Sequence, residues 1–147
     1  MGAALTTPGA VTRFLLAGDA RFTLVSQATG RRFTYRLREA SERPGTYWLS
    51  ALTGPDNEAN YKYALTVRSS PMGGWQAYAT KGSKIAIDAP SVTAFRWWFA
   101  RLTSDEPERA LEQVEFWHEG RCGRCGRLLT VPESIALGLG PECAGRS

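Results

Sequence analysis

Three cysteines and one histidine lie near the C-terminus, in the pattern His118-x3-Cys122-x2-Cys125-x17-Cys143. Thiolate sulfur and imidazole nitrogen are ligands that zinc prefers, and a structural zinc ion takes four ligands in a tetrahedron. A Cys-x-x-Cys pair supplies two of them from one tight turn. His118 is the only histidine in the chain. The pattern predicts a Zn²⁺ site formed by His118, Cys122, Cys125 and Cys143.

Other interpretations of these residues stay open. Water, Glu142 or a partner chain could replace His118 as the fourth ligand, and the cysteines could be buried structural residues without a metal. A disulfide is disfavoured because the number of cysteines is odd and no secretion signal is evident. A thioredoxin-like redox pair would need a strand–helix–strand context, which this segment lacks.

The pattern around the cysteines does not favour catalysis. A zinc nucleobase deaminase needs His-x-Glu, followed at a distance by Pro-Cys-x-x-Cys. Here Glu119 follows His118 directly, and Arg121 precedes Cys122. Three thiolates and one imidazole would also complete the coordination shell, which is typical of structural zinc. We therefore expect a protein that is not an enzyme.

The stretch from Trp117 to Arg127, continued by residues 138–143, resembles a small zinc-binding domain of unknown function from bacteriophages and mobile elements. It also resembles a domain attached to phage helicase-type proteins. Residues 22–35 and 52–58 are similar to the upstream region of such phage proteins. The resemblance implies a phage origin and a metal held by the four residues named above, but it implies no known activity.

Arginine supplies 15 of the 18 positively charged residues, and the net charge is +4. Arginine makes bidentate and stacked contacts with phosphates and bases. In the predicted strand 32–38, side chains alternate between two faces, so Arg32, Arg36 and Arg38 share one of them. The alternative is a solvated basic surface without a specific partner.

Two further groups of residues are candidate nucleic-acid contacts. Trp97 and Arg101 lie one helical turn apart and could form a stacking platform for bases. The alternative is that the C-terminal module covers Trp97. Arg121, Arg124 and Arg127 surround the Cys-x-x-Cys turn and could contact phosphates, or could simply offset the negative charge of the metal site.

Strand and helix patterns alternate along the first two thirds of the chain. Residues 21–26, 32–38, 46–52, 61–67 and 75–79 have strand character and are joined by turn residues, which is typical of an antiparallel meander. A short helix is expected over residues 10–17, and a longer one from an N-cap at Ser91 to Leu102, with one apolar face.

We therefore expect an α+β fold, in which an antiparallel β-meander packs on a helix and is followed by a small zinc-ribbon or zinc-knuckle module. The expected boundaries are a sheet-and-helix domain over 1–103, an acidic connector over 104–117 and a zinc-binding module over 118–147. Residues 114–118 are ambiguous, with a preference for strand. Metal ligation would supply the folding energy of so small a module.

These features favour a non-catalytic phage zinc protein that binds nucleic acid. Single strands are favoured over duplexes because no recognition helix is evident. The alternative is a protein-binding inhibitor of a host protein, such as a counter-defence factor, with Tyr and Trp as anchors. No run is long and apolar enough for a membrane span, so we expect a cytoplasmic protein without a membrane partner.

Overall fold

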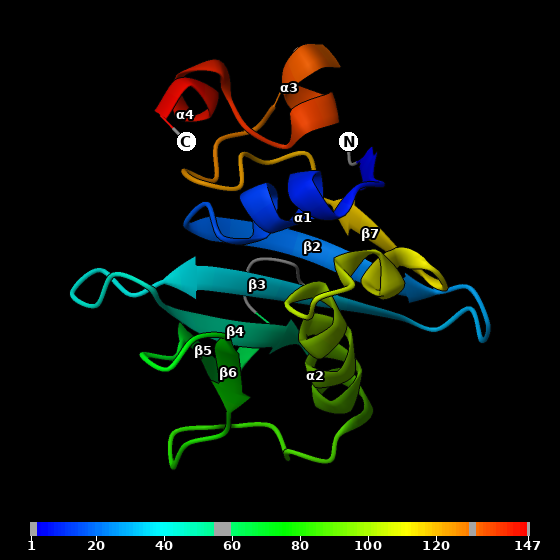
Figure 1. Ribbon diagram of the computed structural model, residues 1–147, viewed down its shortest axis with the longest axis vertical. Helices are drawn as coiled ribbons and strands as arrows, with labels where there is room; N and C mark the ends of the chain where they lie inside the picture. Colours follow the sequence, from blue (N-terminus) through cyan, green and yellow to red (C-terminus); the bar gives the residue numbers. More distant parts are fainter. Residues whose placement is uncertain (1–2, 55–59, 130–131, 147) are drawn as a thin grey trace.

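The computed structural model describes residues 3–54, 60–129 and 132–146, and of residues 132, 133, 142 and 146 it describes the backbone alone. Figure 1 shows the arrangement of its elements. In chain order they are β1 (Ala3–Leu5), α1 (Pro8–Leu15), β2 (Asp19–Ser26), β3 (Arg32–Glu39), β4 (Thr46–Leu52), β5 (Tyr61–Ser69), β6 (Trp75–Tyr78), α2 (Pro90–Leu102), the 3₁₀ helix η1 (Pro107–Leu111), β7 (Val114–His118), α3 (Pro132–Leu137) and α4 (Pro141–Arg146).

The strands form one antiparallel sheet in the order β1-β7-β2-β3-β4-β5-β6. From β2 to β6 each strand pairs with the next along the chain, as expected of a meander. The other side of β2 pairs with β7, which in turn pairs with β1. The last strand in sequence is thus an inner strand of the sheet, next to the first.

The segment predicted as an acidic connector is part of the folded body. Ala110, in η1, is fully buried, and β7 hydrogen-bonds to strands on both of its edges. Phe116 and His118 alternate with more exposed residues along β7, so two aromatic side chains point into the core. Burial of this face makes residues 114–118 a strand of the sheet, so the boundary expected at residue 118 falls inside β7.

Helices α1 and α2 cover the same face of the sheet, seen in front of it in Figure 1. Between them and the strands lies an aromatic core in which Phe116 stacks on Phe22 and on Trp98, with ring centroids 5.0 and 5.6 Å apart. Helix α2 begins two residues earlier than an N-cap at Ser91 predicts, because Pro90 occupies its first position and Ala89 is the cap residue.

The opposite face of the sheet is not covered by any helix of the described residues (Figure 1). Its side chains alternate with those of the core, and the strand registers place them in rows. Arg38 of β3 lies beside Trp48 of β4, which lies beside Thr66 of β5. We call this surface the open face.

The C-terminal module packs against the N-terminal part of the chain. The carbonyl oxygen of Gly123 accepts a hydrogen bond from the backbone N–H of Asp19, with N and O 2.7 Å apart. A guanidinium nitrogen of Arg13 in α1 donates to the carbonyl oxygen of Ala144 in α4 at 2.7 Å. Arg121 and Leu128 form an isolated β-bridge across the Cys-x-x-Cys turn, and the short helices α3 and α4 follow it.

Candidate metal centre and basic surfaces

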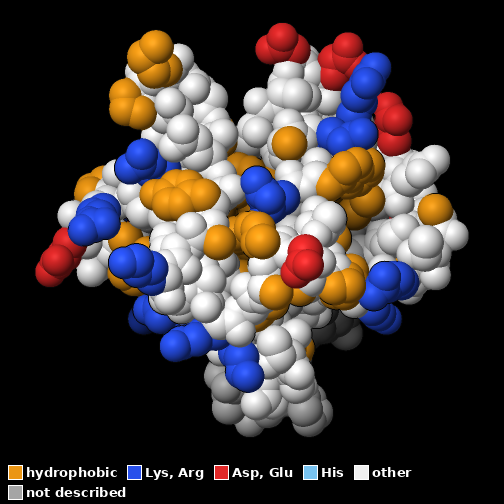
Figure 2. Space-filling model, turned by 90° about the horizontal axis from the view of Figure 1, so that it is seen from below, with side chains coloured by type: hydrophobic (Ala, Val, Ile, Leu, Met, Phe, Trp, Pro, Cys, Tyr) orange, Lys and Arg blue, Asp and Glu red, His pale blue; other side chains and the backbone are white. Residues whose placement is uncertain are grey.

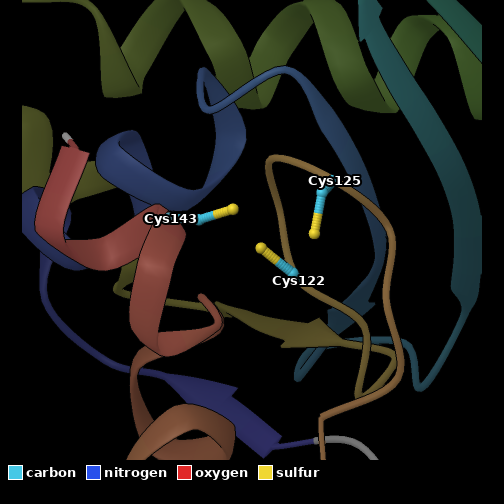
Figure 3. Close-up of side chains that lie close together, drawn as sticks. All are labelled: Cys122, Cys125 and Cys143. Atoms are coloured by element: carbon cyan, nitrogen blue, oxygen red, sulfur yellow. The ribbon is translucent and has the colours of Figure 1, made fainter.

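The three cysteines come together at the C-terminal module, as Figure 3 shows. Cys122 and Cys125 lie on the loop after β7, and Cys143 lies in α4, with its sulfur directed at the other two. All three Sγ atoms are within 4.8 Å of one another. Cys122 is buried, Cys143 is half-buried and Cys125 is exposed. Residues far apart in sequence thus form one cluster of soft ligands.

A tight turn positions the first two sulfurs. The backbone N–H of Gly126 donates to the carbonyl oxygen of Cys122 at 2.9 Å, and the N–H of Cys122 donates to the carbonyl oxygen of Arg127 at 2.8 Å. Gly126 has a φ of +77°, which a residue with a side chain rarely adopts. These bonds close the turn and bring both sulfurs to the same side.

The cluster has the dimensions and chemistry of a metal site. A tetrahedral zinc ion with Zn–S distances of about 2.3 Å holds its sulfurs roughly 3.8 Å apart, and sulfurs within 4.8 Å need only a small adjustment to reach that spacing. The three cysteines could therefore hold a metal ion. Sulfur ligands suit zinc, whereas magnesium and calcium prefer oxygen.

The backbone around Cys122 favours its thiolate. Burial raises the pKa of this thiol, but N–H groups of Gly140, Cys125 and Arg124, together with a hydrogen bond from the side chain of Cys143, outweigh burial and lower it. The N–H of Arg124 lies 3.4 Å from Sγ. Burial and the two neighbouring sulfurs raise the pKa of Cys143 to about 11. A cation held among the sulfurs would offset the cost of placing negative charges so close together.

The structure does not bring His118 into this cluster. Its ring is 1% exposed, and both nitrogens are engaged by backbone groups. Nδ1 accepts a hydrogen bond from the N–H of Gly120 at 2.9 Å, and Nε2 contacts the carbonyl oxygen of Ile135. The arrangement therefore gathers three of the four predicted ligands, because both nitrogens of the imidazole already bond to backbone groups that follow β7 in the chain.

Three cysteine ligands leave a fourth position to be filled. The side chain of Glu142, an alternative ligand on sequence grounds, lies outside the described residues. Beside Cys143 the surface opens into a cavity of about 440 Å³, whose lining includes Arg13, Arg124 and Glu39. The cysteine cluster thus adjoins a charged, solvent-accessible recess.

The predicted arginine row lies on the open face, but its members differ in their contacts. Arg36 donates two hydrogen bonds to the carboxylate of Asp19, at 2.8 and 3.0 Å. Burial raises the pKa of Asp19, but this bidentate pair with Arg36, together with the charges of the other arginines nearby, outweighs burial and lowers the pKa. Arg38 and Arg21 lie near the same carboxylate and lower its pKa further. Arg32 is exposed on the same face, near Glu115.

An aromatic side chain on this face was not among the predicted contacts. Trp48 is 49% exposed and lies directly beside Arg38 in the sheet. Together with Ser50, Tyr63 and Thr66 these two residues line a cavity of about 440 Å³. The sequence holds a signal for this exposure in the alternation along the strand. A strand that buries Tyr47 and Leu49 must expose Trp48 on the opposite face.

The remaining predicted contacts lie elsewhere. Trp97 is 45% exposed on the outer side of α2, and the guanidinium of Arg101 lies 3.8 Å from the centre of its ring. The C-terminal module therefore does not cover Trp97, and Arg101 occupies one face of its ring. This pair is on the helix-covered side of the sheet, whereas Arg32, Arg36 and Arg38 are on the open face.

The three arginines of the cysteine turn differ in their contacts. Arg124 and Arg127 are exposed, and the guanidinium of Arg121 donates to the carbonyl oxygen of Gly126 at 3.1 Å. Asp19, which pairs with Arg36 on the open face, also lies near this turn. A Cβ on Gly126 would lie 3.2 Å from the Asp19 carboxylate. The cysteine turn and the arginines around Asp19 are thus neighbours in space.

The comparisons with known proteins bear on the C-terminal module alone. A family of unknown function (DUF6011) matches residues 115–147, the segment that holds most of β7 and the three cysteines. Neither the search of curated proteins nor that of solved structures finds a significant match. Among the described residues, no helix combines the length and the apolar character that a bilayer crossing would require.

Proposed function

We propose that this protein is a non-catalytic zinc protein, of phage origin, that binds single-stranded nucleic acid across its open face. The observation that carries the proposal is the pairing of Arg38 with Trp48 on a sheet surface that no described helix covers. An exposed tryptophan offers a flat ring on which a base can stack, and the adjacent guanidinium can contact a phosphate. Together they provide both parts of a site for one nucleotide.

Neighbouring residues extend this pair into a longer track. The guanidinium of Arg68 lies 5.6 Å from the centre of the Tyr78 ring, so a second cation and aromatic ring lie close together on adjacent strands. In the other direction, Arg36 and the Asp19 carboxylate lead to the cysteine turn and its arginines. A single strand, which exposes its bases, can follow such a track more readily than a duplex can.

The metal has a structural role in this proposal. Zinc held by Cys122, Cys125 and Cys143 would fix the turn whose arginines border the open face. The fourth ligand would be water, Glu142 or a group from a partner. Because binding energy would come from arginines and aromatic rings, the metal would position these arginines without contacting the strand.

The test is fluorescence anisotropy of labelled single-stranded DNA and RNA over a range of salt concentrations. The key variant is Arg38→Ala, and its matched control is Arg109→Ala. Arg109 is an exposed arginine in η1 that pairs with Glu106, so the control removes one positive charge outside the open face. Removing one phosphate contact to a single strand should reduce the slope of log K against log salt by about 0.7.

We expect Arg38→Ala to weaken binding and lower this slope, and Arg109→Ala to leave both nearly unchanged. Equal effects of the two variants would mean that only net charge matters, and the open face would then not be the site. Absence of salt-dependent binding to any strand would refute the proposal. A host protein retained after nuclease treatment would then favour the alternative, an inhibitor that binds a host protein.

A further inference from the structure

A third recess lies on the helix-covered side of the sheet, between the end of the β2–β3 hairpin and α2. It encloses about 490 Å³, within the range of small-ligand pockets. Aromatic side chains line it from two elements: Phe33 from β3, and Trp97 and Trp98 from α2. Leu24 and Val114 add aliphatic surface from the sheet. Its walls are therefore suited to a flat, apolar ring.

One wall residue carries a hydrogen-bond donor without a partner. Trp98 is fully buried, and its Nε1–H has no acceptor among the described residues. Buried N–H groups are nearly always paired in folded proteins, so an unpaired one needs an explanation. Trp98 lines the recess, and an acceptor on a bound molecule provides it once the lining shifts enough to expose the nitrogen. An aliphatic ligand would fill the same space and leave this donor unpaired.

The outer part of the recess is polar. The exposed side chains of Arg31 and Asp88 both line it, with the amide of Gln113. The guanidinium of Arg31 lies 5.2 Å from the centre of the Phe33 ring, beside one aromatic wall. A carboxylate can accept from an exocyclic amino group, and a guanidinium can contact a phosphate. Charged groups of both signs thus lie at the entrance to an aromatic pocket.

Figure 2 views the molecule from the end that carries β6 and the first turn of α2. Hydrophobic side chains gather in the centre of this surface, and Lys and Arg side chains border them. An anionic group attached to an aromatic ring would therefore meet positive charge as it approached this end.

We propose that this recess binds one nucleobase, with the ring between the aromatic walls and the attached phosphate toward Arg31. A base presents ring nitrogens or carbonyl oxygens to which the Nε1–H of Trp98 can donate, and adenine, guanine and cytosine carry amino groups that can donate to Asp88. The site lies on the opposite side of the sheet from Trp48. It is thus separate from the proposed track on the open face and does not depend on it.

The test is calorimetric titration of the full-length, metal-loaded protein with the common nucleoside monophosphates, followed by tryptophan fluorescence. The variant that fills the recess is Ala94→Phe, since Ala94 lines it and lies on the same helix as the tryptophans. The matched control is Ala100→Phe. Ala100 lies on α2 and does not line the recess; it borders a neighbouring groove, with Trp75 and Ala77, that shares Thr93 and Trp97 with the recess.

We expect at least one monophosphate to bind saturably, with Ala94→Phe weakening it by about tenfold or more and Ala100→Phe leaving it unchanged. Trp98→Phe, which keeps an aromatic ring but removes the N–H, should also weaken binding. If Trp98→Phe fails to fold, Ala94→Phe still decides. No saturable binding of any monophosphate, or equal binding by wild type and Ala94→Phe, would overturn the proposal.

The same variants identify the source of the base. If short oligonucleotides compete with the monophosphate and Ala94→Phe weakens both, the recess accepts a base within a strand. If monophosphates alone respond, it takes the free nucleotide. Trp48→Ala should not change monophosphate binding in either case. Failure of the open-face track and failure of this pocket are therefore distinguishable.

Discussion

The imidazole of His118 lies against the carbonyl oxygen of Ile135 and links β7 to α3. Its other nitrogen accepts from Gly120, so the ring is held at two points by backbone groups. Burial lowers the pKa of this histidine and outweighs the bond to Ile135, which raises it. His118 thus holds the backbone between β7 and the cysteine turn in place, and it lies outside the cluster of three sulfurs.

This arrangement predicts that the metal content of the protein does not depend on His118. Replacement of His118 by Gln should leave one metal ion per chain, while lowering the free energy of unfolding by about 1–3 kcal/mol because buried backbone partners lose their bonds. Cys122→Ser should abolish stoichiometric metal. Elemental analysis after gel filtration measures the metal content, and chemical denaturation measures the free energy of unfolding.

The matched variant for this comparison is Cys143→Ser, which removes a ligand at the other end of the cluster and should lose metal as Cys122→Ser does. Equal metal loss in the His118 and cysteine variants, with the His118 variant still folded, would instead identify the imidazole as a ligand. That result would require a rearrangement of α3 away from the ring.

A second prediction concerns the packing of the cysteine turn on α1. A Cβ on Gly123 would lie 2.6 Å from a ring carbon of Phe14 and 2.8 Å from its carbonyl oxygen. Backbone cannot easily move there, so Gly123→Ala should destabilise the protein by about 1–3 kcal/mol and weaken metal binding. Thermal denaturation and competition with a metal chelator measure these two effects.

Gly145→Ala is the control for this substitution, since nothing lies within 4 Å of a Cβ at that position. It should be neutral or slightly stabilising, because alanine favours α4. If Gly123→Ala behaves in the same way, the turn does not pack on Phe14 as described.

The pair of Asp19 and Arg36 predicts a pH dependence of stability. Burial raises the pKa of Asp19, but Arg36, with Arg38 and Arg21, outweighs burial, so the folded-state pKa lies below the ordinary value of 3.8. The pair therefore contributes its full stability above that value and loses it as the pH falls through the folded-state pKa. Asp19→Asn should remove about 1 kcal/mol at neutral pH and flatten the acid side of the curve.

Denaturant unfolding at several pH values checks this expectation. The side chains of Arg36 and Asp19 are 22% and 20% exposed, so salt should reduce the effect only partly. If the free energy of unfolding of Asp19→Asn falls with decreasing pH as steeply as that of the wild type, other carboxylates control acid unfolding.

The exposed ring of Trp48 makes a fourth prediction. Trp48→Ala removes a side chain that is 49% exposed, so stability should change little. Loss of a stacked base should weaken binding of single strands by about 1–3 kcal/mol. The change should be nearly independent of salt, unlike that of Arg38→Ala, because no phosphate contact is removed. Anisotropy at two salt concentrations separates the two effects, and an unchanged affinity would exclude Trp48 from the site.

Local patterns predicted much of the fold. Alternation placed Phe33, Tyr35 and Leu37 on one side of a strand and the arginines on the other, as the sheet shows. Helical spacing placed Trp98 in the core and Trp97 outside it. The Cys-x-x-Cys turn and Cys143 could be identified from sequence because soft ligands at such spacing have few other uses, and they do come together.

Long-range relationships were beyond these patterns. Residues 104–117 look like an acidic connector, yet β7 pairs with β1 and β2, and pairing between segments so far apart in sequence leaves no local signal. His118 has the residue type and spacing of a ligand, but whether its ring faces the sulfurs or the core depends on how α3 packs. Likewise, the exposure of Trp48 follows from alternation only once the buried face of β4 is known.

By itself the sequence determined which side chains could form a metal cluster and which strands could bury one face, because both depend on residue type and short spacing. The tertiary structure alone decided which groups meet. In the folded chain the ring of His118 lies against the backbone of Ile135, Trp48 lies beside Arg38, and α2 packs over the β2–β3 hairpin. The physical reason is that burial and hydrogen bonding are satisfied over the whole chain at once, so a side chain with two possible partners is assigned only by packing.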